Sequence, residues 1–197
     1  MLDQILRELE KEGYSHIPGL LQDEELTAIN HFFDHHKKQF EAARIGSHDN
    51  KKRSDTIRGD FTFWLDPLEP QEPFVSYFKF LDQLKEKINA RFFLGLQEYE
   101  CHLAYYPPGT FYRKHLDRFE KNSSRKISFV FYLNEKWSPE CGGELILYDQ
   151  QGGVVRTIYP MAGTFVCFLS DEYPHEVRPA IKERRSLTGW IHTKILN

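Results

Sequence analysis

Three residues in this sequence have the side chains and the spacing of a metal site. His115 and Asp117 are two residues apart, and residues i and i+2 of a β-strand point to the same face of a sheet. We expect His175 to reach the same ion from a later strand. Two imidazoles and one carboxylate are typical of non-haem Fe(II) sites that keep coordination positions open, whereas structural zinc prefers four closed ligands. In a chain with nine histidines the His-x-Asp triplet alone is a weak signal of a metal site, so the interpretation depends on the surrounding residues.

The run that begins at Arg184 suits the binding of a carboxylate near that ion. On a strand, Arg184, Ser186, Thr188 and Trp190 share one face, which places a guanidinium, two hydroxyls and an indole together. An arginine can bind the distal end of a dicarboxylate through two parallel hydrogen bonds, which a lysine cannot do. We expect Arg184 rather than Arg185 to face the site, because of its spacing from His175 and the face that it shares with Thr188.

Further motifs surround these residues. They are Tyr105-Tyr106-Pro107-Pro108-Gly109, Tyr132-Leu133-Asn134-Glu135-Lys136-Trp137, Gly142-Gly143-Glu144-Leu145 and Pro174-His175-Glu176-Val177-Arg178-Pro179. With them the chain, from about Tyr14 to its end, resembles the Fe(II)/2-oxoglutarate-dependent dioxygenases. Within that superfamily it resembles the prolyl 4-hydroxylase family, of the hypoxia-sensing type and its bacterial relatives.

One upstream segment narrows the resemblance to this family. Ile57-Arg58-Gly59-Asp60, followed by Trp64, is similar to the mobile finger loop that closes over the peptide substrate of these hydroxylases. The resemblance therefore implies that Arg58, Asp60 and Trp64 belong to a substrate loop. Because an aspartate is rarely buried alone, we expect Asp60 to form an exposed ion pair with Arg125 on the closing surface.

The resemblance also implies roles for the site residues. His115, Asp117 and His175 would be the catalytic iron ligands, and Arg184 would bind the distal carboxylate of 2-oxoglutarate. Tyr132 and Thr188 would help to hold that carboxylate, and Tyr106 would line the pocket. The implied cofactor and cosubstrates are Fe(II), 2-oxoglutarate and O2, with ascorbate as a candidate reductant.

The function implied is the hydroxylation of a prolyl residue in a protein substrate, with succinate and CO2 as co-products. Since bacterial relatives act on a translation elongation factor, such a factor is the first candidate partner. Two alternatives remain open: hydroxylation of a small molecule such as a free amino acid, and a non-catalytic cupin-like sensor that only binds metal. The sequence has no phosphate-binding glycine loop, nucleophile elbow or dinucleotide fingerprint.

Composition is consistent with an enzyme of one domain. A chain of 197 residues is of ordinary single-domain size. The formal net charge of −3 and a pI near 6.3 make nucleic acid an unexpected partner. No apolar run has the length of a membrane span, so we expect no membrane partner. Three cysteines without a Cys-x-x-Cys pair favour a reducing compartment, and we expect a cytoplasmic protein.

The expected fold is α+β, with helices first and short strands after them. Apolar spacing predicts helices from Leu2 to Gly13, over residues 23–41, and after Pro73. Many strands without intervening helices favour a double-stranded β-helix, the jelly-roll of cupins, buttressed by the N-terminal helices. We therefore expect one domain over residues 1–197, with helical support and the finger loop in 1–97 and the catalytic jelly-roll core in 98–197.

Two segments carry more specific expectations. Residues 127–133 alternate so that one face is wholly apolar and the other carries Tyr132. The apolar face would pack on helices and Tyr132 would point into the pocket, although a core tyrosine with a satisfied hydroxyl fits the pattern equally well. The basic segment 46–53 is expected to be an exposed loop, which either contacts substrate or is simply solvated.

Overall fold

The computed structural model describes residues 1–43, 56–117 and 124–193. Its helices are α1 (Leu2–Glu12), α2 (Asp23–His36), α3 (Val75–Phe92) and the short 3-10 helices η1 (Lys37–Gln39) and η3 (Pro139–Cys141). Its first six strands are β1 (Tyr14–Ile17), β2 (Glu41–Ala42), β3 (Phe61–Leu65), β4 (Leu96–Tyr106), β5 (Tyr112–His115) and β6 (Arg125–Tyr132). The remaining strands are β7 (Leu145–Tyr148), β8 (Val154–Ile158), β9 (Phe165–Leu169), β10 (His175–Val177) and β11 (Arg184–Thr193).

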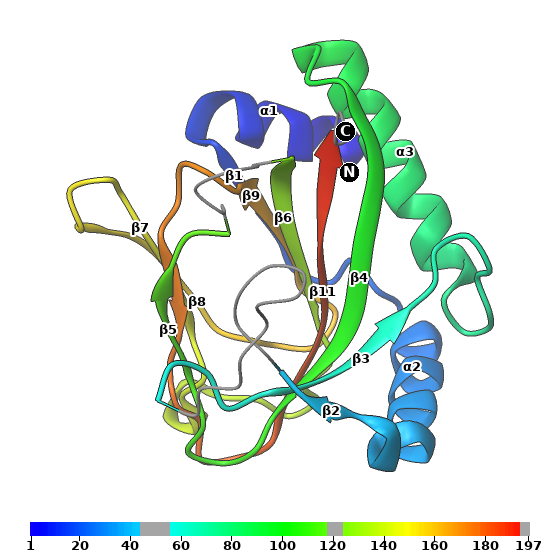
Figure 1. Ribbon diagram of the computed structural model, residues 1–197, viewed down its shortest axis with the longest axis vertical. Helices are drawn as coiled ribbons and strands as arrows, with labels where there is room; N and C mark the ends of the chain where they lie inside the picture. The colour runs from blue at the N-terminus through cyan, green and yellow to red at the C-terminus, as the bar shows by residue number, and fades with distance from the viewer. Residues whose placement is uncertain (44–55, 118–123, 194–197) are drawn as a thin grey trace.

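The strands form two antiparallel sheets. The larger sheet has seven strands in the order β1-β9-β6-β11-β4-β3-β2, and the smaller has four in the order β5-β10-β7-β8. Figure 1 shows the helices on one side of the larger sheet and the smaller sheet on its other side. The result is a mixed helix and sheet protein, and the expected combination of supporting helices with antiparallel strands is confirmed.

Two apolar cores hold these layers together. The first joins the helices to the outer face of the larger sheet, through fully buried side chains such as Ile5, Phe33 and Leu81. The second lies between the two sheets and is smaller, with Val130 and Val166 from the larger sheet against Leu147 from the smaller. The functional pocket lies beside this second core, because the same strands line both.

Strand β6 divides its side chains between these cores as its alternation predicts. Ile127, Phe129 and Phe131 belong to the helix-side core. Ser128 and Tyr132 point to the opposite face and line the pocket. Since Tyr132 is fully buried there, the expectation that it faces the pocket is confirmed.

Helix boundaries agree with the sequence at one end of the chain and differ further along. Gly13 ends α1 in the left-handed conformation, with φ 68°, and its N–H donates to the carbonyl of Leu9. Helix α2 was expected to continue to residue 41, but it ends at His36 and is followed by η1 and the short strand β2. The chain turns there because Phe40 is buried against Phe33, with their ring centroids 4.6 Å apart.

The expected finger loop is only partly a loop. Its second half forms β3, which pairs with β4 along its whole length, so Trp64 lies on a sheet strand opposite His102. Upstream, Arg58 forms an isolated bridge with Tyr112. The segment 46–53 lies outside the described residues.

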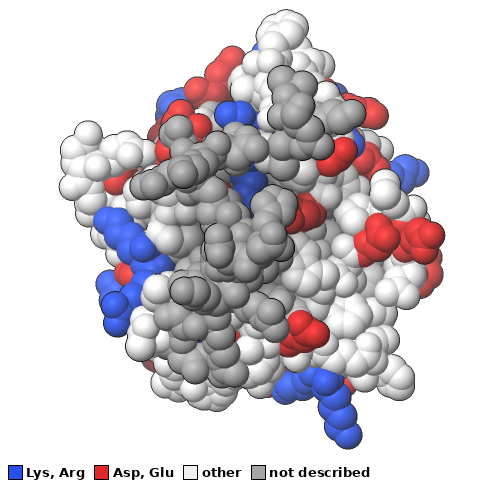
Figure 2. Space-filling model, viewed as in Figure 1, with Lys and Arg blue, Asp and Glu red and all other residues white. Residues whose placement is uncertain are grey.

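The described helices include none that is long and apolar enough to cross a membrane. Figure 2 shows basic and acidic side chains in small groups on the visible face, and both signs of charge occur there.

Candidate active site

The three expected ligands meet at the edge of the smaller sheet. His115 ends β5 and His175 begins β10, directly opposite it in the sheet register. Asp117 was expected on the same strand as His115, but it follows the end of β5 by two residues. Its carboxylate nevertheless lies 3.5 Å from Nε2 of His115 and 3.4 Å from Nε2 of His175. One donor atom from each of the three residues lies within 4.8 Å of the others, which suits one ion.

The backbone orients both imidazoles toward this point. Nδ1 of His115 lies 2.7 Å from the carbonyl of Arg113, and Nδ1 of His175 lies 3.0 Å from the carbonyl of Tyr173. A carbonyl only accepts, so Nδ1 carries the proton and Nε2 presents its lone pair. Burial lowers the pKa of His175 to about 4, which favours the neutral ring that a metal requires.

The carboxylate of Asp117 is oriented by a chain of two serines. Ser128 on β6 donates to its Oδ2 over 2.7 Å, and the hydroxyls of Ser128 and Ser170 lie 2.9 Å apart. All three residues are buried. Burial alone would raise the pKa of Asp117, but His175, His115 and Ser128 outweigh it and hold the pKa well below its usual range. The carboxylate is therefore anionic and ready to bind a cation.

Arg184 lies on the same inner face as expected, and Arg185 does not. Arg184 begins β11, is 2% exposed and donates from Nε to the carbonyl of Gly143 over 2.9 Å. Gly143 has to be a glycine, because its φ is 73° and a Cβ there would lie 3.2 Å from Cδ of Arg184. Arg185 faces the helices instead and pairs with Asp34 and Glu183.

The terminal nitrogens of Arg184 have no carboxylate partner in the described part of the chain. Its guanidinium lies between two tyrosines, 5.0 Å from the ring centroid of Tyr106 and 5.1 Å from that of Tyr132. The hydroxyl of Tyr132 is buried and also lacks a partner there. A buried cation without a counter-ion is costly, and so is a buried hydroxyl without a partner, so their juxtaposition indicates an anionic ligand that binds both.

Thr188 and Ser186 share this face, but they are not equivalent. Both line the pocket with Arg184, as the alternation of β11 predicts. The hydroxyl of Thr188 donates to the carbonyl of Phe129 over 2.8 Å, so its proton is committed to the backbone. Ser186 is buried next to Arg184 and lies opposite Tyr132 in register. Ser186 was not assigned a role from sequence, although the alternation of the strand placed it on the same face as Arg184.

The substrate-loop residues lie differently from the expectation. Asp60 is buried, not exposed, and both of its carboxylate oxygens accept from Arg58, over 2.7 and 2.6 Å. Arg125 instead pairs with Glu100 and stacks on Trp190, with its guanidinium 3.6 Å from the ring centroid. The expected ion pair of Asp60 with Arg125 is therefore wrong for this structure.

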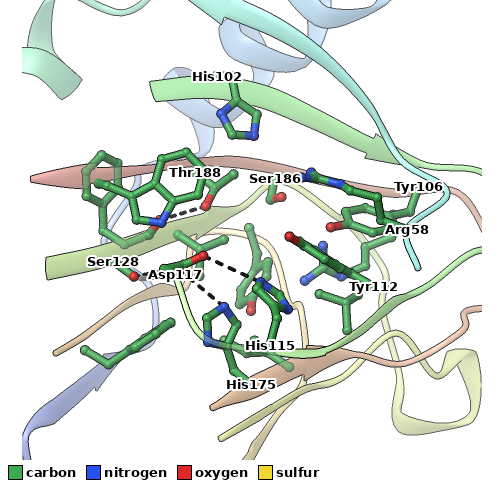
Figure 3. Close-up of a pocket in the computed structure, with 18 residues that line it drawn as sticks. Arg58, His102, Tyr106, Tyr112, His115, Asp117, Ser128, His175, Ser186 and Thr188 are labelled. Atoms are coloured by element: carbon green, nitrogen blue, oxygen red, sulfur yellow. Dashed lines mark hydrogen bonds and ion pairs between the residues drawn. The ribbon is translucent and has the colours of Figure 1, made fainter. Parts of the chain in front are cut away.

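Three residues that line the pocket, Tyr112, Ser128 and His102, were given no role from sequence. Tyr112 stacks on His115 with ring centroids 3.6 Å apart, and Arg58 lies over its other face at 4.3 Å. Ser128 and His102 line the same pocket. Figure 3 shows Arg58, Tyr106 and Tyr112 gathered to one side of the triad, with His102 at the far wall. Only Tyr112 could have been singled out from sequence, because it lies in the same strand segment as His115, three residues before it and five before Asp117.

The donor set is chemically suited to one ion and one dicarboxylate. Two neutral imidazoles and a carboxylate bind Fe(II) on one side and leave positions for other ligands. The arginine lies in the same pocket as the triad and can bind the far end of a ligand whose other end reaches the ion. The residues present therefore fit iron and a dicarboxylate cosubstrate.

Comparison with known proteins agrees with this chemistry. A family model described as the 2OG-Fe(II) oxygenase superfamily matches residues 101–192, which include all three ligands and Arg184. Egl nine homolog 1 of Homo sapiens is 30% identical over 145 residues, covering 70% of this chain and 33% of the relative. The chain thus spans about a third of the length of this curated relative.

Two solved structures are similar over almost the whole chain. A prolyl hydroxylase from Trichoplax adhaerens, in complex with a hypoxia inducible factor peptide fragment, has a TM-score of 0.82 and 26% identity, over 97% of this chain and 88% of that one. A Pseudomonas putida prolyl-4-hydroxylase has a TM-score of 0.87 and 40% identity, over 98% of this chain and 100% of that one. On this similarity, and on a site that fits its cofactors, the chain belongs to the 2OG-Fe(II) oxygenase superfamily and, within it, to the prolyl hydroxylase family.

Proposed function

We propose that this protein hydroxylates a prolyl residue of a protein substrate, with 2-oxoglutarate converted to succinate and CO2. Membership of the family implies Fe(II), 2-oxoglutarate and O2. The observation that carries the proposal is that buried Arg184, which has no carboxylate partner among the described residues, lies in the same pocket as the metal triad. A prolyl substrate is supported by the similarity to the Pseudomonas putida prolyl-4-hydroxylase along the full chain.

The roles of the residues follow from their chemistry. His115, Asp117 and His175 would hold the iron. Arg184 would bind the distal carboxylate of 2-oxoglutarate through its two terminal nitrogens, and Tyr132 would donate its unpaired hydroxyl to the same group. Tyr106 would pack against the guanidinium and keep water from it. Thr188 would contribute indirectly, because its hydroxyl donates to the carbonyl of Phe129 and so fixes the backbone of β6 beside the pocket.

Iron and 2-oxoglutarate, when bound, would supply the oxidising chemistry that hydroxylates a C–H bond with O2. The chain's own contribution is to position the proline and to exclude water. Trp190, Tyr112 and Arg58 line the pocket and would form the wall against which the substrate chain lies. The stack of Arg58 on Tyr112 and of Tyr112 on His115 connects this wall to the metal centre.

We propose further that residues 1–197 form one domain whose two sheets make a double-stranded β-helix. The support is that the two antiparallel sheets face each other across a shared core and the pocket. Residues 98–197 supply the site ligands, and residues 1–97 supply α1, α2 and α3 together with β1, β2 and β3.

The experiment is turnover of proline-containing peptides with Fe(II), 2-oxoglutarate and ascorbate. Peptides from a translation elongation factor are the first candidates, with free proline as the comparison. The expected result is a mass increase of one oxygen on a prolyl peptide, with an equal amount of succinate. Oxidation of free proline alone would favour a small-molecule hydroxylase. Metal binding without succinate from any substrate would favour a non-catalytic sensor.

A further inference from the structure

One wall of the pocket is formed by a histidine that the chemistry above does not use. His102 lies on β4 and lines the same pocket as the metal ligands. In register it lies between Trp64 of β3 and Thr188 of β11. Figure 3 shows it on β4, beyond Thr188 and Ser186 and apart from the triad. It belongs to the substrate side of the pocket rather than to the metal centre.

Two indoles fix the ring of His102. Its centroid lies 4.6 Å from that of Trp64 and 5.6 Å from that of Trp190. Trp64 remains 51% exposed, whereas His102 is only 2% exposed. Together the three rings form an aromatic row that leads from the protein surface into the pocket. Both indoles are tilted against the imidazole, at 47° and 36°, and their packing orients the ring without a hydrogen bond to its Nδ1.

The ring also carries an unsatisfied polar atom. Nδ1 of His102 is buried and has no hydrogen-bond partner among the residues that the structure describes. A buried polar atom without a partner is destabilising, and such atoms in a native pocket usually have a ligand or a functional reason. The packing of two large indoles holds the ring in place despite this cost.

The surroundings keep the ring uncharged. Burial, together with the nearby Arg58 and Arg125, lowers the pKa of His102 to about 3, and Asp117 offsets only part of this shift. At neutral pH the imidazole is therefore neutral and offers one N–H donor and one nitrogen acceptor. A neutral donor and acceptor pair suits an amide, which has the same two functions, better than it suits a carboxylate or an ammonium group.

We infer that His102 is a specificity-determining residue that hydrogen-bonds a backbone amide of the substrate peptide beside the target proline. The inference rests on the proposed prolyl hydroxylation and names the chemical feature by which the site selects its substrate. A free amino acid has no backbone amide to offer, so His102 would favour a peptide. An apolar side chain in this place would pack between the indoles equally well but would lose the selection.

The test uses the full chain and a panel of proline-centred peptides, from which one that the wild-type protein hydroxylates is chosen. For that peptide, each amide flanking the proline is replaced in turn by an ester. His102→Leu removes both hydrogen-bonding functions, and His102→Asn keeps a donor and an acceptor. Tyr77→Phe is the matched control, because the hydroxyl of Tyr77 is equally buried and without a described partner but lies in the helix-side core.

We expect His102→Leu to raise the KM for the peptide about tenfold, since one net hydrogen bond is lost. The KM for 2-oxoglutarate should change much less, His102→Asn should recover part of the peptide affinity, and Tyr77→Phe should leave the peptide KM as it is. For the wild-type protein, one of the ester analogues should have a KM about tenfold higher than the parent peptide. For His102→Leu, the same ester should have the same KM as the parent peptide, because the hydrogen bond is already lost. Thermal melting of each variant verifies that it folds. The ester series with the wild-type protein tests the hydrogen bond even if a variant does not fold.

Two results would overturn the inference while the proposed function stands. They are an unchanged peptide KM in folded His102→Leu, and ester effects that add fully to the effect of the substitution. Hydroxylation of free proline but of no peptide would overturn both the inference and the proposed function.

Discussion

The two faces of β4, β6 and β11 carry different kinds of buried side chain. Toward the helices these strands present Leu103, Phe129 and Leu187, which are apolar and almost wholly inaccessible. Toward the pocket the same strands present His102, Tyr132 and Arg184, which are equally inaccessible but polar.

The contrast separates two uses of burial. On the helix face, burial is stabilising because apolar area leaves water. On the pocket face, the described residues leave the hydroxyl of Tyr132 and Nδ1 of His102 without a hydrogen-bond partner, and they give Arg184 no carboxylate partner. Each of them is a place for a ligand atom. The helices also carry such atoms, since the hydroxyl of Tyr77 on α3 and Oδ1 of Asn30 on α2 lack a partner among the described residues, but Tyr77 lies in an apolar core.

The largest effect should follow removal of a metal ligand from the pocket face. Asp117→Ala removes the only carboxylate of the triad, so turnover and Mn(II) binding should both fall below detection. The helix-side core is untouched, so the thermal melt should remain cooperative. Mn(II) titration followed by electron paramagnetic resonance measures the binding, with Asp82→Ala, at an exposed position of α3, as the control. Near wild-type binding in carboxylate-free buffer would show that Asp117 is not a ligand.

The second effect separates two adjacent arginines on opposite faces. Arg184→Ala should weaken 2-oxoglutarate binding by about 2 to 5 kcal/mol, because it leaves a buried carboxylate unpaired. Arg185→Ala should change 2-oxoglutarate binding little, since Arg185 pairs with Asp34 and Glu183 away from the pocket. The KM for 2-oxoglutarate in the two variants decides between them. A larger rise with Arg185→Ala would contradict the assigned faces of β11.

The third effect belongs to the helix face of the same strand. Leu187 is fully buried among the helices, one position away from Ser186 in the pocket. Leu187→Ala should lower the free energy of unfolding by about 2 to 5 kcal/mol. The KM for 2-oxoglutarate of the folded fraction should be unchanged. Denaturant unfolding and steady-state kinetics measure the two quantities, and a change confined to the KM would mean that the faces are not independent.

A smaller effect is expected where the protein orients a metal ligand indirectly. Ser128→Ala removes the hydrogen bond to Oδ2 of Asp117 and should weaken Mn(II) binding by about 10- to 100-fold. Ser128→Thr retains the hydroxyl and should restore most of the affinity. Ser170→Ala, one step further from the carboxylate, should cost less. Equal affinities for wild-type protein and Ser128→Ala would mean that the backbone alone orients Asp117.

Alternation along single strands was sufficient to predict much of this arrangement. In residues 127–133 and 184–190 a period of two separates apolar from polar side chains, so the pocket positions of Tyr132 and Arg184 could be predicted. The surroundings of Asp60 could not be predicted in this way. Its burial depends on β3 joining the larger sheet beside β4, and such non-local pairing leaves no local pattern.

The same limit applies to His102. Around it, Cys101, Leu103 and Ala104 are all small or apolar, so alternation does not distinguish the two faces of β4. Its contacts come from Trp64 and Trp190, which are brought to it by strand order. Ser128 became significant only when Asp117 was placed beside it. The side-chain types of the triad and the alternation along single strands could be predicted, whereas the packing of His102 and Ser128 against neighbouring strands required the structure.

The smallest effect concerns the pH dependence of stability, again from the pocket face. The pKa of His102 is about 3 in the folded protein and near 6.5 when the chain is unfolded. Between these values the unfolded chain binds a proton that the folded protein does not, so stability rises with pH and is lost as pH falls. From pH 7 to pH 5 this residue should account for a loss of about 1 to 2 kcal/mol, which His102→Asn should remove. Denaturant unfolding of metal-free wild-type protein and variant at both pH values measures the difference. Parallel losses in the two proteins would mean that His102 is protonated in the folded state, and its ring would then be too well solvated to serve as a neutral partner for an amide.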